Sequence, residues 1–352
     1  MMRLPRFQYF APSSVEEAAE RLAKGGDAMV VGGGTDVLPN MKRRQQTPAT
    51  LIGLRRIPEL ARVQPGDGLT LGAGLTLAGL LDLPQLGGAY AGLRQAAAQV
   101  ATPLLRNMGT LGGNLCLDTR CNYYDQSYEW RKAIDFCMKK DGDTCWVAPS
   151  SRRCLAVSST DTAPMLVALQ AWVTLVAADG TRRIPVSALF QNDGIHYLTR
   201  RPTEILTEVH LPRLDGWRSA YWKLRRRGSF DFPVLSAAVA VKIAADGAVE
   251  DARIVLGAVS SRPLEADAAA ASLIGRPLAD AEVARAAELA AEPARPMDNT
   301  DFPLTWRKRV VRDFVSYALK DVRGDDLSEL RRRRQASTII VQASGPAPGE
   351  RF

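Results

Sequence analysis

Cysteine is absent from most of this sequence. All five cysteines lie between Cys116 and Cys154. The N-terminal residues Met1-MRLPRFQYF contain no apolar stretch of the signal-peptide type, and no apolar run approaches the roughly 20 residues that cross a bilayer. These absences predict a cytoplasmic protein without membrane contact, in which structural disulfides are not expected. The clustered cysteines are therefore a candidate site for a metal or an iron–sulfur cluster, because soft thiolates hold zinc or iron.

Familiar catalytic motifs are absent too. The chain contains no Ser-His-Asp set, no H-E-x-x-H and no Walker loop, and His196 and His210 lack the spacing of a ligand pair, so we expect both to be structural. Nothing predicts a catalytic residue or a molybdenum site. The net charge is +8, partly from the run Arg331 to Arg334. That run has no interleaved aromatics, so a solvated or subunit-binding tail is favoured over a nucleic-acid partner.

The pattern of apolar residues divides the chain. Alternating short helices and strands continue to about residue 111, the cysteine segment interrupts them, and a strand meander followed by alanine-rich helices begins near 215. The fold class predicted is α+β. We expect a first domain over 1–214 with a cysteine-rich insertion at 116–155, a C-terminal α+β domain over 215–324 and a mobile basic tail over 325–352.

Local signals place the individual elements. Ser14 and Glu17 have capping-box spacing at the start of a helix, and Asp246-Gly247 is a hairpin turn. The helices expected are 12–23, 76–83, 92–101, 162–171, 264–275, 279–291 and 306–322. The strands expected are 28–31, 51–54, 69–74, 172–180, 219–227, 235–245 and 249–260.

Two glycine loops carry the first chemical signal. In Val30-VGGGTDVL, three glycines after a strand free consecutive backbone N–H groups, which suit a pyrophosphate. It is not a Rossmann fingerprint, because Val37 stands where G-x-G-x-x-G needs glycine, and alone it could be a tight strand–loop connection. The second loop, Thr110-LGGN, offers two more glycines with the side chains of Thr110 and Asn114. Together the loops could clasp both ends of a diphosphate cofactor such as FAD.

The order of the motifs resembles one family. VVGGGTDVL, the Gly72-AGLT segment, RNMGTLGGNL, Ser159-TDTAP and Tyr221-WKLRRRGSFDFP are similar to the FAD-binding subunits of molybdenum hydroxylases, the xanthine dehydrogenase and carbon monoxide dehydrogenase group. The resemblance runs to about residue 324. It implies a two-part FAD domain of the vanillyl-alcohol-oxidase (PCMH) type, followed by the smaller α+β domain of the carbon monoxide dehydrogenase flavoprotein type.

The resemblance also implies the residues that hold FAD. Asp161 is expected to bind flavin ribityl or ribose hydroxyls, although it could simply cap a helix. Lys223, otherwise a solvated charge, is expected near the isoalloxazine ring, where a cation would stabilise reduced flavin. The full set of expected cofactor-binding residues is Val31, Gly32, Gly33, Gly34, Thr35, Asp36, Thr102, Thr110, Gly113, Asn114, Asp161, Leu206 and Lys223.

The cysteine insertion narrows the resemblance. NLCLDTRCNYYDQS with the later cysteines looks like the FAD subunit of the 4-hydroxybenzoyl-CoA reductase group, which carries an additional 4Fe–4S cluster. The ligands implied are Cys121, Cys137, Cys145 and Cys154, and Cys116 is left as a free thiol. A structural zinc site and unligated thiols stay open as alternatives, although the spacing lacks the C-x₂-C knuckle of zinc ribbons.

The resemblance implies an electron-transfer subunit with no substrate site of its own. Electrons from ferredoxin would reach 2Fe–2S centres on a small subunit and a molybdenum cofactor on a large subunit, in a dimer of heterotrimers that dehydroxylates 4-hydroxybenzoyl-CoA. One alternative is a subunit of this type that serves another substrate. An alternative of a different class is a zinc-binding scaffold without enzymatic activity.

Overall fold

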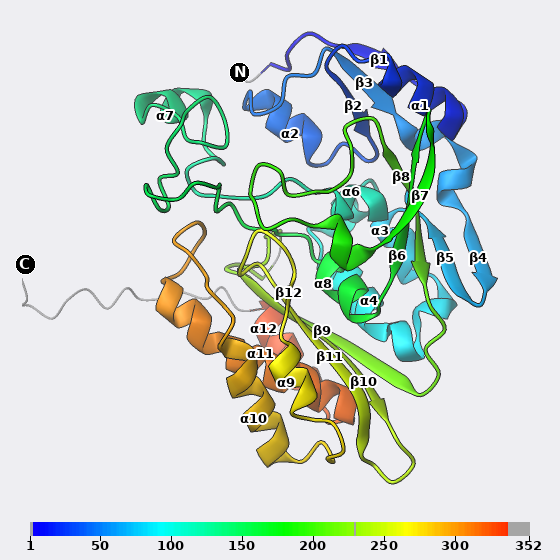
Figure 1. Ribbon diagram of the computed structural model, residues 1–352, viewed down its shortest axis with the longest axis vertical. Coiled ribbons are helices and arrows are strands. Elements are labelled where there is room, and N and C mark those ends of the chain that lie inside the picture. Colours follow the sequence, from blue (N-terminus) through cyan, green and yellow to red (C-terminus); the bar gives the residue numbers. More distant parts are fainter. Residues whose placement is uncertain (1–2, 229, 337–352) are drawn as a thin grey trace, which may run out of the picture.

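The computed structural model describes residues 3–228 and 230–336. Figure 1 shows two sheets in the N-terminal part and a third below them. The first sheet is parallel, in the order β1-β3-β2. Its strands are β1 (Gln8–Phe10), β2 (Ala28–Val31) and β3 (Thr50–Gly53). The first glycine loop leaves β2 and meets the second glycine loop at Met108 and Thr110.

The predicted helix after residue 12 forms as α1 (Val15–Ala23). Ser14 Oγ accepts from Glu17 N at 3.2 Å, as the capping box predicts. The reciprocal bond differs, because the Glu17 carboxylate accepts from Ser13 N at 2.7 Å rather than from Ser14 N. The helix buries Val15, Ala18, Ala19 and Leu22 against the sheet, and this apolar stripe follows the helical period.

The second sheet is antiparallel, in the order β4-β5-β8-β6-β7. Its strands are β4 (Val63–Gly66), β5 (Gly68–Gly72), β6 (Trp172–Ala177), β7 (Gly180–Pro185) and β8 (Ile205–Leu211). Short helices share its core, and they are α3 (Leu77–Leu81), α4 (Ala91–Ala98), α6 (Leu111–Leu115) and α8 (Thr162–Ala168). The remaining helices of this part are α2 (Val37–Lys42) and α5 (Pro103–Arg106), with 3-10 turns at Leu54–Arg56, Pro58–Ala61, Pro84–Leu86, Gly88–Tyr90 and Val186–Leu189.

The third sheet forms the C-terminal part, in the order β12-β11-β10-β9. Its strands are β9 (Trp217–Leu224), β10 (Leu235–Ile243), β11 (Val249–Gly257) and β12 (Leu264–Glu265). Its helices are α9 (Asp267–Ala271), α10 (Asp280–Ala291) and α11 (Leu304–Arg323). The predicted α+β class is thereby confirmed.

Strand β10 is buried on both faces, which explains its uninterrupted apolar run. Ala237 and Val239 belong to the core shared with α10 and α11, whereas Ala238 and Ala240 belong to the core of the N-terminal part. Small side chains on the second face allow α4 and α8 to approach the sheet closely. The sequence predicts helices on one face, and the second face is covered by the neighbouring domain.

The cysteine insertion is mostly irregular and lies beside α2 (Figure 1). Its helix is α7 (Tyr128–Ala133), capped by Ser127 Oγ, which accepts from Trp130 N. The C-terminal part holds both ends of the insertion. Asn122 N donates to Asn299 O at 2.9 Å, and Ser158 N donates to Ser260 O at 3.0 Å.

The end of the described chain differs from the expected tail. Ser328–Ala336 forms helix α12, and Arg331 lies over the Trp222 ring at 4.1 Å while it donates to Tyr221 O at 3.2 Å. The remaining part of the expected tail, 337–352, lies outside the described residues. No helix within 3–228 and 230–336 combines the length and hydrophobicity that crossing a bilayer requires.

Candidate functional site: a flavin cleft beside a cysteine pocket

The main cleft, of about 530 Å³, lies between the two glycine loops. Eleven of the expected cofactor-binding residues line it, and they are Val31, Gly32, Gly33, Gly34, Thr35, Asp36, Thr110, Gly113, Asn114, Asp161 and Leu206. Thr102 and Lys223 are not among the lining residues. Thr102 instead caps α5, where its hydroxyl accepts from Leu105 N at 3.4 Å.

The two loops pack directly against each other at Gly33. A Cβ built there would lie 1.8 Å from Met108 O and 2.9 Å from Gly109 N. Gly34 has φ +72, a conformation that strains residues with a Cβ. The sequence explains Gly33 by the approach of a phosphate, and the structure adds a nearer cause, because the backbone of the second loop already fills the space.

The second loop is anchored to the start of α8 through Asn114. Its Oδ1 accepts from Thr160 Oγ1 at 2.8 Å, from Thr162 Oγ1 at 2.7 Å and from Thr162 N at 3.1 Å. Thr110 Oγ1 accepts from Gly113 N at 3.1 Å. Asn114 thus fixes the wall of the cleft with its oxygen, which leaves its amide N–H groups for a ligand.

Asp161 lies at the junction of the two domains. It occupies the N-cap position of α8 without capping it, which rules out the simple capping role. Its carboxylate accepts from Tyr221 Oη at 2.7 Å and from Lys223 Nζ at 3.0 Å. Lys223 Nζ also donates to Gln99 O at 3.0 Å and to Asp231 O at 2.9 Å, so it is a buried counter-ion behind the wall of the cleft and not a solvated charge.

Burial dominates the electrostatics of this pair. Desolvation raises the pKa of the Asp161 carboxyl against the lowering effect of Lys223. Desolvation likewise lowers the pKa of the Lys223 ammonium, opposed by Asp161. Each charge is therefore held in place by the other, and the position of the Asp161 carboxylate at the cleft depends on Lys223.

Four cysteines converge on a second, smaller pocket. Cys121, Cys137, Cys145 and Cys154 are each 5–7% exposed and line it together with Tyr123, Tyr124 and Lys139. None of the five cysteines forms a disulfide. Cys116 lies apart from this group and lines the main cleft.

The surroundings of the four thiols combine burial with backbone donors. Burial raises the pKa of the Cys121 thiol to about 12 and that of Cys154 to about 11, and neighbouring thiols add to both shifts. Ala156 N donates to Cys154 Sγ at 3.4 Å. Within the described residues, no three His, Cys, Asp or Glu side chains are close enough to share one metal ion.

Two family models match the chain. The FAD binding domain in molybdopterin dehydrogenase matches residues 5–214, and the CO dehydrogenase flavoprotein C-terminal domain matches residues 219–322. The chain belongs to the FAD-binding medium subunits of the molybdenum hydroxylase and carbon monoxide dehydrogenase family. Members of this family are oxidoreductase subunits.

Named relatives agree with this family. The chain is 27% identical to 6-hydroxypseudooxynicotine dehydrogenase complex subunit alpha of Paenarthrobacter nicotinovorans, over 90% of this chain and 95% of that protein. It is 30% identical to the aldehyde oxidoreductase FAD-binding subunit PaoB of Escherichia coli, over 76% and 86%. It superposes on a chain of carbon monoxide dehydrogenase from Hydrogenophaga pseudoflava with a TM-score of 0.74 and 27% identity, covering 91% of this chain and 98% of that one. None of these is named as a 4-hydroxybenzoyl-CoA reductase.

Unpartnered polar atoms in the cleft give independent support for FAD binding. Ser159 is 2% exposed, lines the cleft, and its Oγ has no hydrogen-bond partner among the described residues. Gln46 Oε1 is a second buried atom at the cleft without a partner in that part of the chain. Buried polar atoms are seldom left unsatisfied, so both indicate a polar ligand. The glycine loops, Ser159 and Asp161 would hold it.

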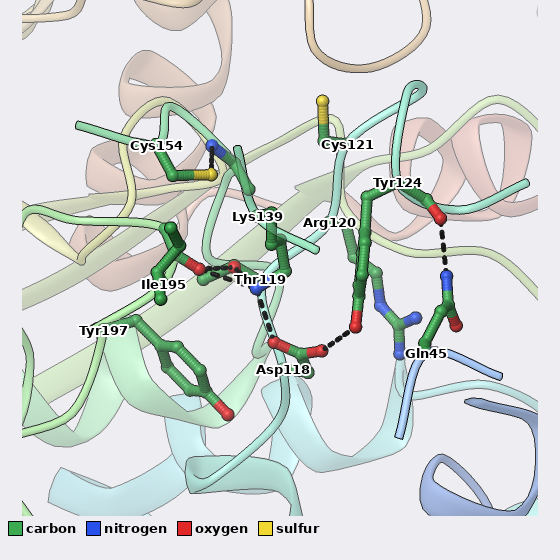
Figure 2. A network of polar contacts seen from close by, with 12 residues as sticks. Gln45, Asp118, Thr119, Arg120, Cys121, Tyr124, Lys139, Cys154, Ile195 and Tyr197 are labelled. Atoms are coloured by element: carbon green, nitrogen blue, oxygen red, sulfur yellow. Dashed lines mark hydrogen bonds and ion pairs between the residues drawn. The ribbon is translucent and has the colours of Figure 1, made fainter. Parts of the chain in front are cut away.

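Asp118, Arg120 and Lys139 carry no sequence motif, and they join the cleft to the cysteine pocket. Lys139 Nζ donates to Asp118 Oδ1 at 2.8 Å, and Tyr124 Oη donates to Asp118 Oδ2 at 3.1 Å (Figure 2). Arg120 forms an ion pair with Asp36 of the first loop. The one sequence feature that could indicate these three residues is their charge within a cysteine-rich loop. Charged residues are equally common in solvated surface loops, so this feature does not distinguish the two cases.

Proposed function

We propose that this chain is an electron-transfer subunit that carries FAD and a 4Fe–4S cluster in a molybdenum-dependent complex of the 4-hydroxybenzoyl-CoA reductase type. The observation that carries the proposal is the convergence of four buried cysteines on one pocket next to the flavin cleft of a family member. When bound, FAD and the cluster would supply carriers that exchange single electrons. The protein residues would bind these groups, exclude water and balance their charges.

The donor set is compatible with an iron–sulfur cluster. All four candidate ligands are soft thiols that lie in a mostly apolar pocket, and N–H donation to the Cys154 sulfur is the kind of contact that tunes such clusters. The proposed ligands are Cys121, Cys137, Cys145 and Cys154.

The family supports a proposal about the partners. Relatives bear names such as medium chain and medium subunit, which are parts of larger assemblies. We propose a large molybdenum-cofactor subunit and a small 2Fe–2S subunit as partners, in a dimer of heterotrimers, with ferredoxin as the electron donor in the cytoplasm. The proposed division is an FAD domain over 1–214 with the insertion at 116–155, and a C-terminal domain over 215–324.

Metal and flavin analysis of anaerobically purified protein tests the proposal. We expect about four iron and four sulfide per chain, FAD, and a low-temperature EPR signal after reduction. Zinc without visible colour would overturn it in favour of the scaffold. A folded protein that contains neither iron nor flavin would also contradict the proposal.

The substrate needs the assembled complex. Subunits that co-purify with this chain should reduce 4-hydroxybenzoyl-CoA when reduced ferredoxin is supplied. A complex that instead oxidises an N-heterocycle or an aldehyde with a dye acceptor would show that the same type of subunit serves another substrate. The names of the relatives, which include a nicotine 6-hydroxylase medium subunit, favour including nicotine among the trial compounds.

A further inference from the structure

A buried ion pair lies between the cysteine pocket and the flavin cleft. Lys139 lines the cysteine pocket, and Asp118 lines the flavin cleft. Their side chains are each 7% exposed, and Lys139 Nζ lies 2.8 Å from Asp118 Oδ1. One charge of the pair therefore faces each site.

The ammonium is fixed by more than this pair. It also donates to Thr119 Oγ1 at 2.8 Å and to Gly194 O at 2.6 Å, and it lies 4.8 Å from the centroid of the Tyr124 ring (Figure 2). Gly194 is itself packed on the cysteine pocket, because a Cβ built there would lie 2.6 Å from Cys154 Sγ. These contacts hold the positive charge at the cysteine pocket.

The Asp118 carboxylate is also buried and hydrogen-bonded. Asp118 is 6% exposed, and its second oxygen accepts from Tyr124 Oη at 3.1 Å. Thr119 and Arg120 follow it directly, and both are buried. Asp118 thus lies on the segment that follows the second glycine loop, and Lys139 lies at the cysteine pocket. The ion pair therefore connects the two sites.

We propose that Lys139 and Asp118 form an electrostatic bridge that sets the reduction potential of the group held by the four cysteines relative to that of the flavin. This proposal rests on the proposed function. Reduction adds one negative charge to the cysteine site, and a fixed ammonium in a poorly solvated pocket stabilises that charge. The Asp118 carboxylate offsets part of the effect, and its location at the cleft makes the flavin sensitive to the same pair.

Opposite changes of charge provide the test. In the full anaerobic complex, Lys139→Met should shift the cluster potential to more negative values, and Asp118→Asn should shift it to more positive values. The potentials are measured by EPR-monitored redox titration, with iron and FAD contents determined on the same samples. A purely structural pair would move both variants in the same direction or would only lower cluster content.

Two further variants keep the test decisive. The double variant Lys139→Met with Asp118→Asn leaves no unpaired buried charge and should return the potential towards the wild-type value. Thr119→Val removes a contact of the ammonium without a change in charge and should leave the potential close to wild type. Equal potentials in wild type and both single variants, or shifts of one sign, would overturn the bridge. Lack of a cluster in the wild-type protein would instead overturn the proposed function.

Discussion

Replacement of Gly33 by alanine should separate the two loops that hold FAD. The added Cβ would lie 1.8 Å from Met108 O and 2.4 Å from Met108 C, whereas ordinary Cβ contacts are 3.4–4 Å. The obstacle is backbone, so it cannot rotate away, and one loop must move by more than about 1 Å. Overpacking of this kind costs about 1–3 kcal/mol.

That strain should appear mainly as weaker FAD binding. Loops that relax apart in the apoprotein must be drawn together again by the cofactor, and about 1–3 kcal/mol corresponds to a roughly five- to 150-fold higher Kd. FAD content per chain, fluorescence titration of the apoprotein and the rise in Tm with added FAD all measure the effect.

The matched control is Gly66→Ala in β4. A Cβ at Gly66 would have no heavy atom within 4 Å, so FAD affinity should equal that of the wild type. Wild-type FAD affinity in the Gly33→Ala variant would refute the reasoning about the loops. Equal losses in both variants would show that glycine replacement acts through general stability and not through the cleft.

Three further predictions concern buried groups. Cys121→Ser should lower iron and sulfide content, because a hard alkoxide replaces a soft thiolate, while Cys116→Ser should keep both; the reverse pattern would overturn the ligand set. Lys223→Met should leave the Asp161 carboxylate buried without its counter-ion, lower the free energy of unfolding by about 3–5 kcal/mol and reduce FAD content. Unchanged stability and FAD content would show that Lys223 is dispensable. Glu204 accepts from two arginines, which lower its pKa to about 2 from 4.5. The pKa of Glu204 is lower in the folded state than in the unfolded state. Its contribution to the free energy of unfolding is therefore fully present above pH 4.5 and is lost as the pH falls towards 2. Glu204→Gln should therefore lower stability by about 1–2 kcal/mol at pH 7, after allowance for the solvent-exposed arginines, and a denaturation series should show the difference vanish near pH 2.

Elements with strong local signals could be predicted from the sequence, whereas the strands β1, β4, β7 and β8 and several short helices were not expected. The cap at Ser14 and the turn at Asp246-Gly247 depend on neighbours within a few residues, and both helix α1 and the hairpin of β10 and β11 form as predicted. The two glycine loops were recognisable for the same reason. Their shared cleft follows from the sheets that bring them together, and its lining agrees with most of the expected residues.

Tertiary packing decided what each polar side chain does. From the sequence, a lysine in a strand is predicted to be a solvated charge or a flavin contact. Only the packing of the C-terminal sheet against α8 shows that Lys223 is buried behind Asp161. Lys139 and Asp118 are 21 residues apart and carry no motif, so their pairing depends on the path of the insertion. Sequence by itself determined which residues could do chemistry, since that depends on residue type. The fold decided which of them meet, because burial and distance arise only when remote segments pack together.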